Sequence, residues 1–176
     1  MKLDLRMMIL TALFTALTAI GAFIKIPTSP PITLQFFFIA LGAMLLGSLY
    51  GSLSQIVYLI IGLCGVPIFT QGGGLQYISY PTFGYLLGFA PAAFVIGYIS
   101  DRVKGKVPYL FLCCMIGVLL DYAIGVPYLS YSAHLSLRAA FVGGFLVYLP
   151  GDILKCIIAA LLAQKIIPQL KKLGYR

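Results

Sequence analysis

The sequence predicts an all-α membrane protein with six transmembrane helices in a single domain that covers residues 1–176. Composition is the first reason, since 61% of the residues are hydrophobic and only 9% are charged, whereas a soluble domain carries about 25% charged residues. The mean hydropathy is +1.05. Length is the second reason, because 176 residues accommodate six spans of about 20 residues with short connections.

Six apolar segments define the predicted spans, and turn-forming or charged residues separate them. We retain the first segment as a span, because no small-residue cleavage site followed by a polar chain comes after it. The third segment is short, and the sixth is interrupted by Pro150-Gly151. The predicted spans are Met7–Ile24, Ile32–Leu49, Ser52–Leu63, Phe83–Ile99, Pro108–Ile124 and Gly143–Ile167.

The distribution of basic residues predicts that both termini lie in the cytoplasm. Of the 12 Lys and Arg residues, Lys155 falls within a span, and only Lys25 and Arg138 fall on the predicted outer side. The excess of basic residues marks the cytoplasmic side of a membrane protein, and an even number of spans agrees with this orientation. The residues on the predicted cytoplasmic side are Lys2, Arg6, Arg102, Lys104, Lys106, Lys165, Lys171, Lys172 and Arg176.

Three irregular connections lie on the predicted outer side, at residues 25–31, 65–81 and 125–138. Each contains proline, and the second also contains the run Gly72-Gly73-Gly74. Irregular backbone at membrane depth is tolerated only where protein or a cavity satisfies its polar groups. We therefore expect these connections to form a lid over a cavity that opens to the outside.

Asp152 and Lys155 are the most informative residues, because they stand three apart in a strongly apolar segment. Pro150 favours the first turn of a helix, and an acid suits that end of the helix dipole. We therefore expect a helix from this point to about Ile167, with both charged side chains on one face. A charged residue inside a membrane is a functional-site hypothesis by default. The pair is interpreted either as a structural ion pair or as a polar clamp for a small solute.

Two further polar residues are weaker candidates. Asp121, near the outer end of the fifth predicted span, pairs with Lys155 or Arg138 or else faces the cavity. Gln76 follows the glycine run, where it hydrogen-bonds a solute or simply faces water. Both interpretations stay open from the sequence alone.

A pair of small residues, Ala12 and Ala16, lies at i and i+4 in the first predicted span. Small residues at this spacing let two helices approach closely. The spacing does not distinguish a partner helix within this chain from one in another protein.

Several classes of function are disfavoured. The net charge of +8 does not indicate a nucleic-acid-binding protein, because the basic residues cluster at the ends of apolar segments rather than on a face with exposed aromatics. The glycine run is not followed by the lysine of a phosphate-binding loop. The single histidine, His134, and the four cysteines show no metal-ligand spacing, so we expect no metal site. Four acids without a glutamate leave few general acid–base candidates for an enzyme.

Five motifs in this order resemble the BioY family, the biotin-specific S components of energy-coupling factor vitamin transporters. The resemblance extends over nearly the whole chain, and the combination is more specific than any one motif. The motifs are Thr33-Leu34-Gln35, Gly62-Leu63-Cys64-Gly65-Val66-Pro67-Ile68-Phe69, Pro81-Thr82-Phe83-Gly84-Tyr85-Leu86-Leu87-Gly88-Phe89, Gly125-Val126-Pro127-Tyr128-Leu129 and Leu149-Pro150-Gly151-Asp152-Ile153-Leu154-Lys155.

The resemblance implies a six-helix S-component fold in a prokaryotic cell membrane, with a biotin pocket near the outer face. It implies that a membrane-embedded coupling subunit and two ATP-binding cassette ATPases are the partners. The chain itself would hold no cofactor, since ATP would bind only those partner subunits. Ala12 and Ala16 match the small-residue motif that S components use against the coupling subunit.

Asp152 and Lys155 match the substrate-contacting Asp-x-x-Lys of the family. Gln35, Gln76, Thr82 and Tyr85 are further implied contacts. The chain departs from the common Pro-Thr-Gly-Gly-Tyr pattern at Phe83, which we expect to reshape the pocket wall. The outer part of the fourth predicted span also offers no second cation for the biotin carboxylate.

Three alternatives to a biotin-binding S component remain. The first is an S component for another vitamin, which would have the same architecture. The second is a self-sufficient secondary transporter in which Asp121 or Asp152 carries protons. The third is a membrane enzyme, which the small inventory of acid–base residues disfavours.

Overall fold

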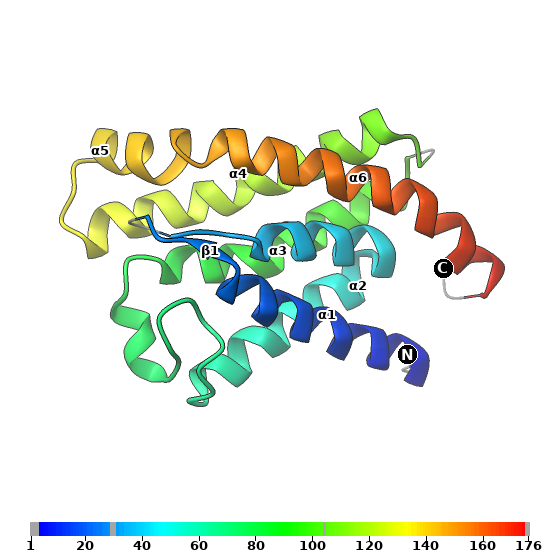
Figure 1. The fold of residues 1–176 in the computed structure, drawn as a ribbon, viewed down its shortest axis with the longest axis horizontal. Coiled ribbons are helices and arrows are strands. Elements are labelled where there is room, and N and C mark those ends of the chain that lie inside the picture. The colour runs from blue at the N-terminus through cyan, green and yellow to red at the C-terminus, as the bar shows by residue number, and fades with distance from the viewer. Residues whose placement is uncertain (1–3, 29–30, 104, 175–176) are drawn as a thin grey trace.

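The computed structural model describes residues 4–28, 31–103 and 105–174, and these residues are almost entirely helical (Figure 1). A short antiparallel hairpin of β1 (Lys25–Ile26) and β2 (Ile32–Thr33) is the only sheet among them. The helices are α1 (Leu5–Phe23), α2 (Gln35–Leu63), η1 (Leu75–Ser79), α3 (Phe83–Ser100), α4 (Val107–Ser132), α5 (Leu137–Phe141), the π-helical segment η2 (Val142–Leu146) and α6 (Leu149–Lys172).

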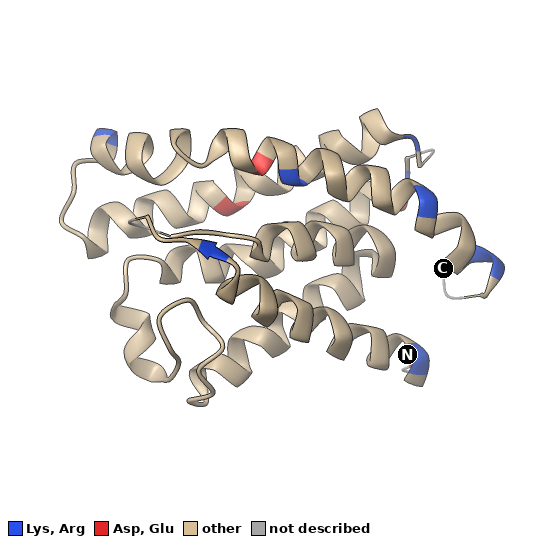
Figure 2. Ribbon diagram, in the orientation of Figure 1, with Lys and Arg blue, Asp and Glu red and all other residues tan. Residues whose placement is uncertain are grey.

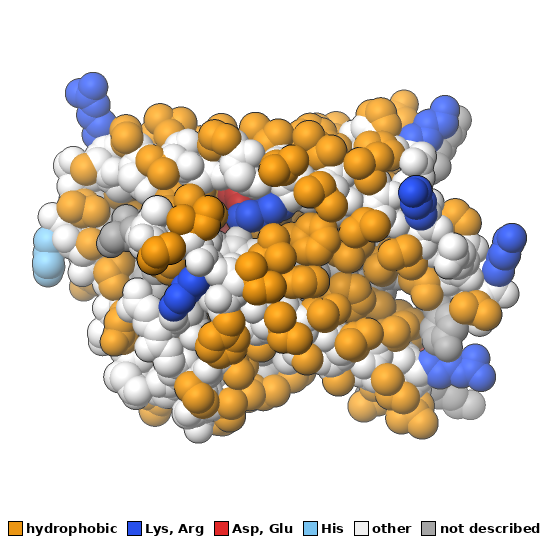
Figure 3. Space-filling model, in the orientation of Figure 1, with side chains coloured by type: hydrophobic (Ala, Val, Ile, Leu, Met, Phe, Trp, Pro, Cys, Tyr) orange, Lys and Arg blue, Asp and Glu red, His pale blue; other side chains and the backbone are white. Residues whose placement is uncertain are grey.

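Five helical stretches in the described part of the chain are long and apolar enough to cross a membrane. They are α1, α2, α3, α4 and the run Leu137–Lys172, with hydropathies between 1.6 and 2.1. The stretches run along the long axis of the molecule, and the start of α1 lies at the same end as the close of α6 (Figure 1). Apolar side chains cover much of the surface that Figure 3 shows. Among the exposed apolar residues, Ile9 and Leu154 are 62% and 59% exposed. The prediction of an all-α membrane protein is confirmed.

Helix α2 folds back on itself at Gly47, which has φ 77° and ψ −177°. The Nε2 atom of Gln35 donates to the hydroxyl of Tyr58, 23 residues later, at 2.9 Å. A straight helix would separate these residues by about 34 Å, so the two arms of α2 run against each other. The arms correspond to the predicted second and third spans. The predicted break at residues 50–51 is wrong by a few residues, because Gly47 adopts the positive φ that makes the turn.

The second half of the chain is more helical than the sequence predicted. Helix α4 continues to Ser132, so the predicted loop at 125–138 is wrong over residues 125–132. Pro127 does not end the helix, because a carbonyl freed by proline inside a membrane protein finds other partners. Likewise α6 runs to Lys172 rather than Ile167, and α5 and η2 precede it without a long break. Asp152 does lie in the first turn of α6, as predicted.

Helices α2, α4 and α6 contact one another in the interior of the bundle. Helix α3 packs between α2 and α4, α6 packs on both α2 and α4, and α1 packs on α2. The α1–α2 contact is partly polar, since Thr15 Oγ1 donates to the Ser54 carbonyl at 2.9 Å. Basic residues gather at the end of the molecule that holds the termini, whereas two acidic positions lie in the interior of the bundle (Figure 2). The interior acids are Asp121 and Asp152, both buried.

Candidate binding site

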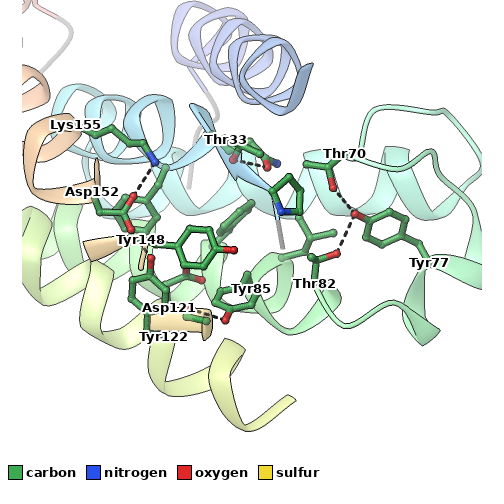
Figure 4. Close-up of a pocket in the computed structure, with 16 residues that line it drawn as sticks. Thr33, Thr70, Tyr77, Thr82, Tyr85, Asp121, Tyr122, Tyr148, Asp152 and Lys155 are labelled. Carbon is green, nitrogen blue, oxygen red and sulfur yellow. Dashed lines mark hydrogen bonds and ion pairs between the residues drawn. The ribbon is translucent and has the colours of Figure 1, made fainter. Parts of the chain in front are cut away.

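A cavity of about 90 Å³ lies where the hairpin and the 65–81 connection meet the helices (Figure 4). Every long helical stretch except α1 contributes to its wall. The lining residues are Pro31 and Thr33 of the hairpin, Gln35 and Phe36 of α2, Thr70 and Tyr77 of the 65–81 connection, Thr82 before α3, Tyr85, Leu86 and Phe89 of α3, Asp121 and Tyr122 of α4, Gly144 of η2, Tyr148, and Asp152 and Lys155 of α6.

Both carboxylate oxygens of Asp152 accept hydrogen bonds from other residues of the cavity. Its Oδ1 atom accepts from Lys155 Nζ at 2.7 Å, within a single turn of α6. Its Oδ2 atom accepts from the hydroxyl of Tyr122 on α4. The predicted pair therefore forms an ion pair, and α4 joins it. Lys155 has further donor capacity, because an ammonium group carries three N–H donors and Asp152 takes one.

Asp121 faces the same cavity but has a different environment. Its side chain is buried, and its Oδ1 atom has no hydrogen-bond partner among the described residues. The carboxylate lies against Gly88 of α3, where an added Cβ would stand 2.2 Å from Oδ1. A buried polar atom without a partner is costly. Asp121 Oδ1 can therefore accept a hydrogen bond from a ligand or a water molecule in the cavity.

Hydroxyl groups line the part of the cavity that is farther from Lys155 (Figure 4). The hydroxyl of Tyr77 is 2.7 Å from Thr70 Oγ1 and 3.1 Å from Thr82 Oγ1. Nearby, Thr33 Oγ1 donates to Gln35 Oε1 at 3.0 Å. These groups are neutral, so the cavity has a charged end and a hydroxyl end.

Aromatic rings occupy the space between the two ends. Tyr85 anchors this part, because its hydroxyl donates to the Gly144 carbonyl at 2.9 Å. The Tyr85 ring packs edge-on against Tyr122, with centroids 5.8 Å apart, and Tyr122 packs on Phe145 at 4.8 Å. Such a middle section suits an apolar ring, because ligand pockets are mostly apolar with a few placed polar groups.

The hairpin borders the cavity and is tied to both of its sides. Lys25 Nζ donates to the carbonyl of Thr70 at 2.6 Å. The side chain of Thr28 hydrogen-bonds Tyr148, the residue one turn before Asp152. Lys25 pairs with Thr33 in the hairpin register, so the strand that carries Lys25 lies directly beside the cavity wall. This agrees with the expected role of the first connection as a cover.

Most residues proposed from the sequence come together in this cavity. Asp152, Lys155, Asp121, Gln35, Thr82 and Tyr85 all line it. Gln76 does not line it, because its side chain is exposed and donates to the Gly73 carbonyl at 2.6 Å. Phe83 does not line it either, so it forms no part of the pocket wall itself, although the adjacent Thr82 does. The Phe83 ring is buried against Tyr128, with centroids 5.8 Å apart.

Sequence reasoning missed five polar residues of the wall. Tyr148 could have been found from helical phase, because it stands four residues before Asp152. Tyr122 could not, because it reaches the cavity through its contact with Asp152 on another helix. Thr33 belongs to the motif Thr33-Leu34-Gln35, of which only Gln35 was named as a candidate contact. Thr70 and Tyr77 belong to an irregular connection, where no periodicity indicates which side chains turn inward.

Ala12 and Ala16 lie away from the cavity, on the exposed face of α1. The opposite face of α1 is buried against α2 and carries Thr11, Thr15 and Thr18. The pair therefore stands on the face of α1 that is not buried against α2. A contact of this face with another protein stays a prediction.

Comparison with known proteins places the chain beside biotin transporters. The model of the BioY family matches residues 1–172. A protein of Lysinibacillus sphaericus described as a probable biotin transporter BioY is 46% identical over 167 residues, which cover 90% of this chain and 85% of that protein. The biotin transporter BioY of Thermotoga maritima is 40% identical over 164 residues, with 92% and 96% covered.

A solved structure shares the fold. It is the crystal structure of the S-component for biotin from an ECF-type ABC transporter, and it superposes with a TM-score of 0.83 at 26% sequence identity. The match covers 92% of this chain and 90% of that chain. The expected S-component fold is therefore confirmed.

Proposed function

Because the chain belongs to the BioY family, we propose that it is a membrane subunit that binds biotin at the outer face and delivers it inward. One observation carries the proposal beyond family membership. Asp121, Asp152 and Lys155, three charged residues of the predicted spans, face one cavity together with aromatic rings. An apolar chain retains intramembrane charges mainly at functional sites.

The chemistry of the cavity suits biotin. The ureido ring of biotin offers two N–H donors and one carbonyl acceptor, which match a carboxylate and an ammonium group. The apolar thiophane ring matches the aromatic section formed by Tyr85 and Tyr122. Asp152 and Lys155 are the proposed polar anchors, with Asp121, Gln35, Thr82 and Tyr85 as further contacts. The side chain of Gln76 is exposed. Gln76 is therefore a proposed contact only if the 65–81 connection changes conformation when the ligand binds.

We further propose six membrane crossings in a single domain, with both termini in the cytoplasm. The two arms of α2 would cross separately, because Gln35 bonds Tyr58 across the turn at Gly47. Lys165, Lys171 and Lys172 lie near the C-terminal end, and basic residues favour the cytoplasmic side. The cavity, with the hairpin and the 65–81 connection around it, would then open toward the outside of a prokaryotic cell.

Energy for transport would come from partner proteins. The proposed partners are a membrane-embedded coupling subunit and two ATP-binding cassette ATPases, which alone would bind ATP. The exposed Ala12 and Ala16 support a helix contact with the coupling subunit, because small residues allow close approach. Replacing both by leucine should abolish ATP-driven uptake and leave biotin binding unchanged.

The test is ligand binding by the purified full-length chain in detergent. We expect nanomolar biotin binding without ATP or a proton gradient, and no binding of thiamin or riboflavin. Tight binding of one of those vitamins beside none of biotin would assign the chain to another substrate. Biotin uptake by the chain alone in vesicles, collapsing with an uncoupler, would instead identify a proton-coupled carrier.

A further inference from the structure

The charged end of the cavity is unsuited to the carboxylate of the proposed ligand. Asp121 and Asp152 both lie there, and Lys155 is the only cation among the described residues that line the cavity. The ammonium group of Lys155 already bonds Asp152 at 2.7 Å. A third carboxylate at this end would meet two acids and one base in a setting where charge interactions are weakly screened. The ligand tail therefore belongs at the hydroxyl end.

The hydroxyl end has a cation on its rim. Lys25 of β1 stands opposite Thr33 in the hairpin, and its Nζ atom lies 2.6 Å from the Thr70 carbonyl. Thr33 and Thr70 both line the cavity, although Lys25 itself does not. A basic residue is visible on β1 beside the bundle (Figure 2). The ammonium group is thus one hydrogen bond away from the cavity wall.

The charge of Lys25 is available to a ligand. A backbone carbonyl does not neutralise an ammonium group, and two of the three N–H donors remain. No ion pair joins Lys25 to an acid among the described residues, and the pair that lines the cavity joins Asp152 to Lys155. The side chain of Lys25 is exposed, so it can reorient at low cost.

We propose that Lys25 binds the carboxylate of the ligand tail and so sets specificity for an acid over its neutral derivatives. This inference rests on the proposed function. The tail would run from the aromatic section past Thr33 and Thr70 to Lys25, while the ureido ring meets Asp121, Asp152 and Lys155. Lys25 would supply the second cation that the outer part of α3 lacks.

The test compares biotin with biotin methyl ester, whose tail is uncharged, on the purified full-length chain. Lys25→Gln removes the charge but keeps an N–H donor for the Thr70 carbonyl, and Lys25→Arg keeps the charge. Arg138→Gln is the matched control, because Arg138 is exposed on α5 and does not line the cavity. It removes the other cation that the sequence places on the outer side.

We expect Lys25→Gln to weaken biotin binding by about fivefold to tenfold, the size of a partly solvated charged hydrogen bond. Binding of the methyl ester should change by less than about twofold, Lys25→Arg should retain most of the preference for the acid, and Arg138→Gln should alter neither ligand. Equal weakening of both ligands would overturn the inference, since Lys25 would then only hold the 65–81 connection. Equal wild-type affinity for both ligands would overturn it as well. A wild-type chain that binds neither would refute the proposed function itself.

Discussion

The two ends of the cavity differ in what holds them in place. Asp121, Tyr122, Asp152 and Lys155 stand on α4 and α6, where helix backbone fixes their relative positions. Thr33, Thr70, Tyr77 and Thr82 stand on the hairpin, on an irregular connection and before α3. The charged end is thus built on rigid elements, and the hydroxyl end on segments that link them.

We expect this difference to separate ligand recognition from ligand access. Groups that select a ligand need fixed geometry, which helices provide better than loops. Loops move more readily than the elements they connect, and binding sites use them as covers. The charged end should therefore contribute most of the biotin affinity. The hydroxyl end should contribute less to affinity and should control access to the cavity. Graded substitutions at the two ends test this division.

Lys155→Met should have the largest effect. The change leaves the buried Asp152 carboxylate with the hydrogen bond from Tyr122 but without a counter-charge. Breaking a buried pair in this way costs about 3–5 kcal/mol, so thermal stability should fall. Biotin affinity should fall by at least about 100-fold, as measured by calorimetric titration.

The double variant Asp152→Asn with Lys155→Met is the matched control for that change. It removes both charges, so most of the thermal stability should return while biotin binding stays weak. Recovery of biotin binding together with stability would show that the pair is structural, and would reverse the assignment of recognition to this end.

Tyr122→Phe should have the next largest effect, because it removes the hydroxyl that donates to Asp152 Oδ2 and keeps the ring in place. A hydrogen bond to a charged group contributes about 1.5–3 kcal/mol. We expect biotin binding to weaken by about tenfold or more. Tyr131→Phe provides the comparison, since Tyr131 is 83% exposed on the same helix. Similar losses in both variants would argue that the Tyr122 hydroxyl has no special role.

Asp121→Asn should have an intermediate effect. The Oδ1 atom of Asp121 lacks a partner among the described residues. Asparagine keeps the shape of the side chain, but it removes the negative charge and replaces one acceptor oxygen by an NH₂ donor. We expect biotin affinity to fall by about threefold to tenfold, the range of a single hydrogen bond. Stability should change little, in contrast to Lys155→Met. Unaltered affinity, measured by the same titration, would remove Asp121 from the ligand contacts.

Thr82→Val should have the smallest effect. The change removes the 3.1 Å contact with the Tyr77 hydroxyl at the hydroxyl end and keeps the side-chain shape. A neutral hydrogen bond contributes about 1 kcal/mol, so the affinity should fall by about fivefold or less. Gln76→Ala should weaken binding less than Thr82→Val does, because the Gln76 side chain lies outside the cavity. A loss at Thr82 as large as that at Lys155 would abolish the distinction between the two ends.

The sequence predicted the parts of this structure that depend on local pattern. The apolar segments located the long helices, because a membrane requires long uninterrupted apolar runs. The three-residue spacing of Asp152 and Lys155 predicted a shared face, and the two groups do bond each other. Asp121 lines the same cavity, as one of the two sequence interpretations proposed, and its carboxylate packs against Gly88 of α3.

The parts that failed depend on contacts between distant segments. The turn in α2 lies at Gly47 rather than at residues 50–51, and nothing local distinguished that glycine from Gly51. Residues 125–132 are helical although glycine and proline predicted a loop, because packing against neighbouring helices overrides weak local preferences. Thr70 and Tyr77 enter the cavity through the folding of an irregular connection, which leaves no periodic signal.

The most direct test is a structure of this chain with biotin bound. The proposed arrangement predicts the ureido carbonyl within hydrogen-bond distance of Lys155 Nζ, an N–H of the ring on Asp121 or Asp152, and the carboxylate directed toward Lys25. A biotin carboxylate bound at Lys155, or a ureido ring held among Thr33, Thr70 and Thr82, would contradict it.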